Sequence, residues 1–158
     1  MTLDDVVSSI LEPALAVLPT RFDTPQARVM LLAIGLQESG FMREDQVGGP
    51  ARSYWQFEIN GVKAVMSFAG TAALSQLVAR HAGIQFDAHV IYSALDHNDQ
   101  LACQFARLLL WSAPGPLPAL GASDAAWALY QSCWRPGKPR PADWLSNYQQ
   151  ALATVSDT

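Results

Sequence analysis

The fold of this chain is decided by one stretch, Val29-Met30-Leu31-Leu32-Ala33-Ile34-Gly35-Leu36-Gln37-Glu38-Ser39-Gly40-Phe41. Its first eight residues are apolar on every face, which is typical of a helix buried in a core. Thr24 can cap such a helix, Pro25 suits its first position and Gly40 suits its end. We therefore predict a buried helix over Pro25–Ser39, with Glu38 in its last turn.

Glu38 lies where two effects raise the pKa of a carboxyl group. Desolvation by the core and the negative end of the helix dipole both favour the protonated form. An acid that keeps its proton near neutral pH suits general acid catalysis, and cleavage of a glycosidic bond requires such an acid. The alternative is a helix-end glutamate that turns into water.

Three later segments continue the pattern that begins at Glu38. The first, at 48–58, reads Gly-Gly-Pro-Ala-Arg-Ser-Tyr-Trp-Gln-Phe-Glu; the second, at 125–131, reads Ala-Ala-Trp-Ala-Leu-Tyr-Gln; the third, at 147–152, reads Asn-Tyr-Gln-Gln-Ala-Leu. In this order the segments resemble the lytic transglycosylase and goose-type lysozyme group. The matched residues are Glu38, Ser39 and Phe41 in its Glu-Ser-x-Phe element, Ala51, Arg52 and Gln56 in Gly-Ala-x-Gly-Leu-Met-Gln, Tyr130 in Ala-Tyr-Asn, and Asn147 and Tyr148 in its final helix.

The resemblance implies a single lysozyme-like domain over residues 1–158, of the α+β class but predominantly α-helical. An N-terminal helix would lie within 1–22, and the region that resembles the family covers 24–152. The implied activity is cleavage of the β-1,4 bond between N-acetylmuramic acid and N-acetylglucosamine in bacterial peptidoglycan. Glu38 would be the catalytic acid and base, and the Tyr130 hydroxyl would orient its carboxyl group. The substrate-binding residues that we expect are Ser39, Tyr54, Gln56, Gln131 and Tyr148, without a metal or other cofactor.

Residues 40–60 predict a small β-hairpin beside the cleft. They contain glycines, a proline and polar residues without a helical period. Strand alternation would direct Trp55 and Phe57 into the core and Tyr54 and Gln56 into the cleft. A sugar groove needs aromatic rings beside hydrogen-bonding side chains, and this segment supplies both.

The chain also departs from the family pattern. Ser53 stands where the family usually has glycine, Tyr54-Trp55 replace Leu-Met, and Val47 stands where many members have serine. Gln131 replaces the asparagine, and the glycine that follows in the family is missing. The departures indicate a divergent member of the small phage-encoded kind. They leave one alternative from another class, a catalytically inactive lysozyme-like module that serves as a structural or wall-binding phage protein.

The mechanism depends on whether a second carboxylate faces Glu38. A hydrolase of the usual kind needs two carboxylates, and the candidates are Glu44, Asp45 and Glu58. In lytic transglycosylases the counterpart of Glu38 works alone, and the 6-hydroxyl of muramic acid attacks to give a 1,6-anhydro product. Because no partner is obvious from the sequence, we favour transglycosylation.

Composition limits the other classes of function. The 158 residues suit one domain, 50% are hydrophobic and 15% are charged, so disorder is not expected. The net charge of -4 argues against nucleic-acid binding. No signal peptide and no run of eighteen apolar residues is visible, so we expect no stable membrane insertion. We expect a monomer that is made in the cytoplasm and reaches the wall after release or inside a virion.

Three smaller features carry weaker predictions. Cys103 and Cys133 suit buried thiols better than a disulfide bond, and the three histidines, eight residues apart along the chain, do not suggest a metal site. Residues 134–139, Trp-Arg-Pro-Gly-Lys-Pro, are either a cationic rim of a sugar groove or a solvated turn, and we favour the turn. Proline, glycine and capping residues predict further helices over residues 3–18, 61–68, 71–82, 87–95, 98–111 and 142–155, and another that begins at Ser123 and carries Trp127 and Tyr130.

Overall fold

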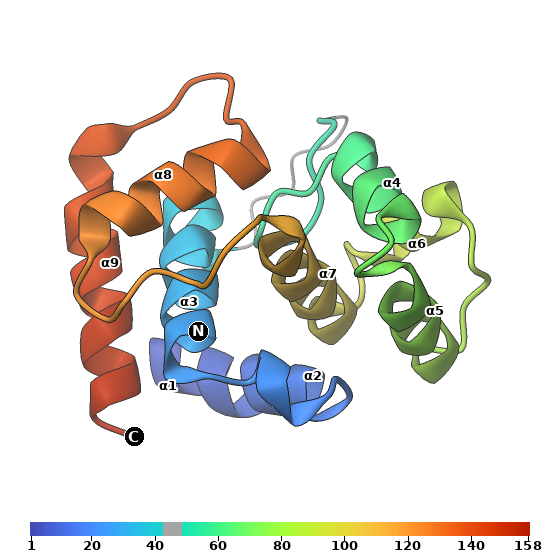
Figure 1. Cartoon of the computed structure of the whole chain (residues 1–158), viewed down its shortest axis with the longest axis horizontal. Coiled ribbons are helices and arrows are strands. Elements are labelled where there is room, and N and C mark those ends of the chain that lie inside the picture. The colour runs from blue at the N-terminus through green and yellow to red at the C-terminus, as the bar shows by residue number, and fades with distance from the viewer. Residues whose placement is uncertain (43–48) are drawn as a thin grey trace.

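The computed structural model describes residues 1–42 and 49–158, and these residues are mostly helical (Figure 1). The predominantly α-helical character is therefore confirmed. The helices are α1 Leu3–Val6, η1 Val7–Leu11, α2 Glu12–Ala16, η2 Thr20–Phe22, α3 Pro25–Ser39, α4 Ile59–Ser67, α5 Ala72–His81, α6 Ala88–Ala94, α7 Asp99–Ser112, α8 Ser123–Trp134 and α9 Pro141–Ser156.

Helix α3 has the bounds that the sequence predicts. The Thr24 hydroxyl accepts a hydrogen bond from the Ala27 N–H at 3.1 Å, which satisfies a free donor of the first turn. Gly40 ends the helix with φ 62°, a left-handed conformation that favours glycine. Residues 29–35 are all buried, and α9 lies alongside α3 (Figure 1). The apolar run thus forms the centre of the molecule.

The N-terminal helical segment continues through Pro13, a residue type that usually breaks a helix interior. The chain passes from α1 through the π-helix η1 directly into α2, which has Pro13 in its first turn. Proline lacks the N–H that an α-helix needs at this position, and the wider π-turn before it changes the hydrogen-bonding pattern without ending the helix.

The prediction of a small β-hairpin over residues 40–60 is wrong. The described part of this segment forms turns with one antiparallel bridge, in which Arg52 and Phe57 exchange two backbone hydrogen bonds of 2.8 Å, and no strand occurs in residues 1–42 or 49–158. Ser53 has φ 69° and Gln56 has φ 50°. Extended strands need negative φ, so the chain reverses within the bridge instead of continuing as a hairpin.

The remaining helices surround α7, whose residues 101–110 are all buried. In Figure 1, α4, α5 and α6 lie on one side of α7, and α3, α8 and α9 lie on the other. Asp87 and Asn98, the first residues of two predicted helices, accept backbone hydrogen bonds and cap α6 and α7. Ser123 is the first residue of α8, and no side-chain hydrogen bond caps this helix. Within the described ranges no one helix is long and apolar enough to cross a bilayer; only α4 and α5 together meet that test, and they are bent by 113°.

Candidate active site around Glu38

The carboxyl group of Glu38 is half-buried in the last turn of α3 and accepts a hydrogen bond from the Tyr130 hydroxyl. Burial raises the pKa of Glu38, as the sequence predicts, and the charge of Glu58 adds to this increase. The hydrogen bond from Tyr130 and the charge of Arg140 act in the opposite direction but do not cancel it. Glu38 is thus an acid that is easier to protonate than an ordinary glutamate.

Tyr130 is held in place by a cluster of aromatic rings. Its ring stacks on that of Trp144 in α9, with centroids 5.3 Å apart and an interplanar angle of 9°. Trp127 packs against both rings, and the Trp144 indole N–H donates to the Ser123 carbonyl at 2.9 Å. Burial and the neighbouring Glu38 raise the pKa of the Tyr130 hydroxyl, so it remains a neutral donor toward the carboxylate.

The residue after the helix end folds back onto α3. Phe41 has φ 53°, and its ring covers Gly35, where a Cβ atom would lie only 2.1 Å from the ring. The same ring contacts Tyr54 and Trp55 at centroid distances of 5.5 and 5.7 Å. The glycine inside a buried helix is therefore explained by the close approach of Phe41, which connects the end of α3 to the 52–57 turn.

The 52–57 turn is fixed on both sides. The Trp55 indole N–H donates to the Leu31 carbonyl of α3 at 2.9 Å. Arg52 forms an ion pair of 2.9 Å with Asp96, whose carboxylate also accepts from the Ser53 N–H at 3.2 Å. Ser53, the position at which the family pattern has glycine, adopts a left-handed conformation that favours glycine.

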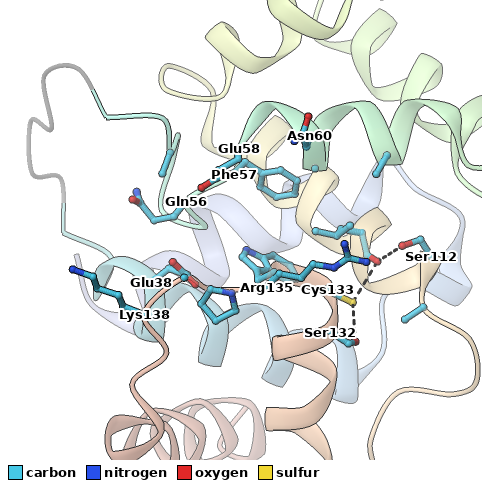
Figure 2. A pocket seen from close by; sticks show the side chains of 18 of the residues that line it. Glu38, Gln56, Phe57, Glu58, Asn60, Ser112, Ser132, Cys133, Arg135 and Lys138 are labelled. Carbon is cyan, nitrogen blue, oxygen red and sulfur yellow. Dashed lines mark hydrogen bonds between the residues drawn. The ribbon is translucent and has the colours of Figure 1, made fainter.

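A groove of about 780 Å³ opens beside Glu38 (Figure 2). Phe57, Leu109 and Trp134 supply apolar surface, and Gln56 and Asn60 supply amides. Its walls come from the helices α3, α4, α7 and α8, from the 51–58 segment and from the two segments that flank α8. The remaining lining residues are Ala51, Glu58, Gly61, Ala64, Ser112, Ala113, Pro114, Ser132, Cys133, Arg135, Pro136, Gly137 and Lys138.

The structure brings together Glu38, Tyr130 and Gln56 from the predicted set. Tyr54 does not line the groove because the segment is a turn, not a strand, and its ring is buried against Phe41. The Ser39 hydroxyl lies outside the lining, where it donates to the Gly35 carbonyl and accepts from the Phe41 N–H, both at 3.1 Å.

Two further predicted binding residues lie away from the groove. Gln131 is exposed on α8 and is not part of the lining. Tyr148 is buried on α9, and its hydroxyl accepts from the Gly121 N–H at 2.9 Å, so it is placed as a helix-packing tyrosine. Neither side chain is in a position to contact a ligand in the groove as it stands.

Of the candidate second carboxylates, Glu58 is exposed and lines the groove together with Glu38. Figure 2 shows the two side chains on opposite walls. Glu44 and Asp45, like Val47, lie outside the described residues.

A polar network beside Glu38 was not anticipated. Gln37 is buried, and its amide donates to the Arg140 carbonyl at 2.9 Å and accepts from the Asn147 amide at 2.8 Å. The Arg140 guanidinium donates to the Gln37 carbonyl. The signal in the sequence was a glutamine directly after a wholly apolar run, because a buried amide requires partners.

The segment 134–139 is part of the groove and not only a solvated turn. Trp134, Arg135 and Lys138 all line it, so the cationic-rim interpretation describes their position. Both cysteines are free thiols; Cys103 is buried as expected, whereas Cys133 is only partly buried.

No group of three potential metal ligands occurs in the described part of the chain. Comparison of the chain with protein-family models, curated proteins and solved structures finds no match. The feature that bears on function is therefore the geometry of the site. An acid with a raised pKa and a fixed hydrogen-bond donor faces a groove lined by polar and aromatic side chains.

Proposed function

We propose that this chain is a lysozyme-like glycosidase that cleaves the β-1,4 bond between N-acetylmuramic acid and N-acetylglucosamine in bacterial peptidoglycan. The observation that carries the proposal is the position of Glu38, half-buried with a raised pKa, oriented by Tyr130 and directed into the groove. General acid catalysis of glycoside cleavage requires an acid of this kind.

The groove suits a glycan on chemical grounds. The partly exposed ring of Trp134 packs against the buried ring of Phe57 at a centroid distance of 5.9 Å and offers apolar surface to sugar faces. The amides of Gln56 and Asn60, on the same lining, offer hydrogen bonds to hydroxyl and acetamido groups. We propose that no metal or other cofactor takes part.

In the proposed reaction, protonated Glu38 donates its proton to the glycosidic oxygen while Tyr130 holds the other carboxyl oxygen. The resulting carboxylate then accepts a proton from the attacking hydroxyl group. In transglycosylation this group is the 6-hydroxyl of the same muramic acid, so the C1–O6 bond replaces the cleaved bond and water is not consumed. We favour this route because it needs one carboxylate.

One observation favours hydrolysis as the second candidate. Glu58 lines the opposite wall of the groove, and its charge acts on Glu38. A second carboxylate across a sugar groove can activate water or stabilise a cationic transition state.

The proposal is tested with purified cell wall in a zymogram that compares the wild type with Glu38→Gln and Glu12→Gln. Glu12 is an exposed glutamate outside the groove, so its substitution is a matched control. We expect Glu38→Gln to reduce lysis at least about 10²-fold and Glu12→Gln to retain it. Equal lysis by the two variants would exclude Glu38 from the chemistry, and an inactive wild type would favour the structural or wall-binding module.

Mass spectrometry of the released muropeptides separates the two routes. Transglycosylation gives 1,6-anhydro-muramic ends, which are lighter by one water than hydrolysis products. We then expect Glu58→Gln to stay within about tenfold of the wild-type rate, because no second carboxylate is needed. Reducing muramic ends together with a large loss in Glu58→Gln would establish hydrolysis instead.

We further propose a divergent protein of the phage-encoded kind that acts as a monomer, after release from the cell or as a virion component. The departures at Ser53 and Gln131 support divergence from the family pattern. Lysis by purified protein added from outside, together with its mass in solution, checks these points.

A further inference from the structure

The groove has one strongly cationic side, the segment of residues 134–140, which we call the lip. It contains Arg135, Lys138 and Arg140, three of the ten Lys and Arg residues in a chain of net charge -4, and no acid. Arg135 and Lys138 line the groove. One side of the groove is therefore cationic although the whole chain has a net negative charge.

The lip is anchored at both ends. At its start the Trp134 indole N–H donates to the Trp55 carbonyl at 2.8 Å. At its end the Arg140 carbonyl accepts from the Gln37 amide at 2.9 Å. Pro136 and Pro139 restrict the backbone between these points. The two groove-lining cations are thus carried by a fixed segment.

Arg135 occupies a position that its backbone does not favour. It caps the end of α8 with φ 48°, in the left-handed region where glycine is the usual residue. The chain nevertheless has an arginine there, and its side chain extends along the groove (Figure 2). An unfavourable conformation of this kind is consistent with a role for the side chain.

Within the described residues, neither groove-lining cation of the lip has an acidic ion-pair partner. No carboxylate in residues 1–42 or 49–158 forms an ion pair with Arg135 or Lys138, whereas Arg140 lies 3.7 Å from Asp143. In the view of Figure 2, Lys138 and Arg135 lie on either side of Glu38. A glycan that crosses Glu38 would therefore pass both charges.

We propose that Arg135 and Lys138 bind carboxylate groups of the glycan, so that the groove selects peptidoglycan with free lactyl or stem-peptide carboxylates over neutral N-acetylglucosamine polymers. This inference rests on the proposed function and names its substrate class. Arginine can bind a carboxylate through two parallel hydrogen bonds, and lysine binds it as a point charge. Because the chain has a net negative charge, attraction to an anionic wall has to arise locally.

The test measures binding of Glu38→Gln protein, which does not cleave, to purified sacculi. Two wall preparations are compared: native sacculi and sacculi whose carboxyl groups have been converted to neutral amides with carbodiimide and methylamine. We expect conversion to weaken binding about tenfold, as two charge-assisted contacts of modest strength would. Adding Arg135→Gln and Lys138→Gln should weaken binding to native sacculi by a similar factor and leave binding to amidated sacculi unchanged.

The matched control adds Lys63→Gln and Arg80→Gln, which remove one lysine and one arginine that are exposed outside the groove lining. Equal weakening by this control would overturn the proposal in favour of a net-charge effect. Unweakened binding of the lip variant, or equal binding of the parent to both walls, would also overturn it.

A second lip variant, Arg135→Gly with Lys138→Gln, keeps a favourable backbone at the helix end and should behave like the double glutamine variant. Equally weakened binding of the two lip variants to native sacculi supports the proposal. If the second variant folds and still binds native sacculi more tightly than amidated sacculi, as the parent does, the proposal is overturned. Because binding is measured without cleavage, charge-selective binding by a protein whose wild type is inactive would contradict only the proposed enzymatic function. Lysis that is insensitive to the lip variants would contradict only the present inference.

Discussion

Glu38 is subject to opposing electrostatic effects. Burial at the end of α3 and the charge of Glu58 raise its pKa, whereas the Tyr130 hydroxyl and the Arg140 charge lower it. The balance lies on the raised side, so the protonated form persists to a higher pH than in an ordinary glutamate. Substitutions at these residues should change both activity and the pH dependence of stability.

Glu38→Gln should change stability in a pH-dependent way. Because the folded pKa of Glu38 lies above the ordinary value of 4.5, the folded chain binds more protons than the unfolded chain between these two values. The contribution of Glu38 to stability is therefore lost as pH rises through this window. The glutamine variant does not titrate, so its melting temperature should rise relative to that of the wild type as the pH increases from about 4.5 through this window. Thermal melts across that range test this; a constant difference would contradict it.

Tyr130→Phe should lower turnover more than stability. Loss of one hydrogen bond costs about 1 kcal/mol of unfolding free energy, but it frees the carboxyl group to rotate. In the wild type this hydrogen bond lowers the pKa of Glu38, so its loss should raise that pKa. The alkaline limb of the pH–activity profile should therefore move to higher pH.

Tyr148→Phe is the control for this change, because the same atom is removed from the same aromatic cluster but its partner is the Gly121 backbone. It should reduce stability without moving the pH profile. A profile that does not move in Tyr130→Phe would limit Tyr130 to packing.

At the scale of elements, the end of α3 and the turn after it form one unit. Phe41, Ser53 and Gln56 all have positive φ, and they lie on the two segments that flank Glu38. The ring of Phe41 lies between Gly35 and the aromatic residues of the turn. The position of the turn relative to the helix end therefore depends on a glycine inside the helix.

Gly35→Ala should destabilise the protein although alanine is the better helix former. The gain in helix propensity is about 1 kcal/mol, whereas displacing a packed ring costs about 1–3 kcal/mol, and the added Cβ would lie 2.1 Å from Phe41. Chemical denaturation should show a net loss. Combining it with Phe41→Leu should give a smaller loss than the sum of the single changes.

Gly61→Ala in α4 is the matched control, because its nearest ring atom, on Phe57, would lie 3.3 Å from the new Cβ. It should cost less than Gly35→Ala. Equal costs at the two positions would show that the Phe41 contact is not responsible.

At the scale of the whole molecule, the groove lies where the end of α3, the start of α4, and the ends of α7 and α8 meet. These helices are distant in the sequence and share one core that includes Leu31, Val62, Phe105 and Tyr130. The walls of the groove should therefore be lost together when the core unfolds.

The two cysteine thiols differ in how deeply they are buried in this core. Cys103 is fully buried in α7, whereas Cys133 is partly buried and lines the groove; burial raises the pKa of both thiols and slows their reaction. Cys133 should react with a thiol reagent in the native protein, and Cys103 only at the rate of unfolding. Labelling of Cys133→Ser and Cys103→Ser variants measures the two rates. Similar native rates would contradict a shared, closed core.

The sequence by itself determined the features that depend on local chemistry. The apolar run, the Thr24 cap and the αL position of Gly40 define α3, and Glu38 is recognisable as an acid at the end of a buried helix. The caps of α6 and α7 are equally local, because a short polar side chain can satisfy the free N–H groups of the first turn.

The tertiary structure decided which distant groups meet Glu38; Tyr130 was expected there from the family resemblance, not from any local pattern. Tyr130 lies 92 residues further along the chain, and the ring of Trp144 that holds it comes from another helix. The expected strand alternation around Tyr54 failed because positive φ at Ser53 and Gln56 is imposed by contacts with α3 and Asp96, not by a periodic pattern. The position of Arg135 and Lys138 beside the groove likewise depends on the hydrogen bonds that anchor the two ends of the lip to Trp55 and Gln37. Local sequence specifies caps and apolar faces, whereas the meeting of polar groups depends on how the helices pack.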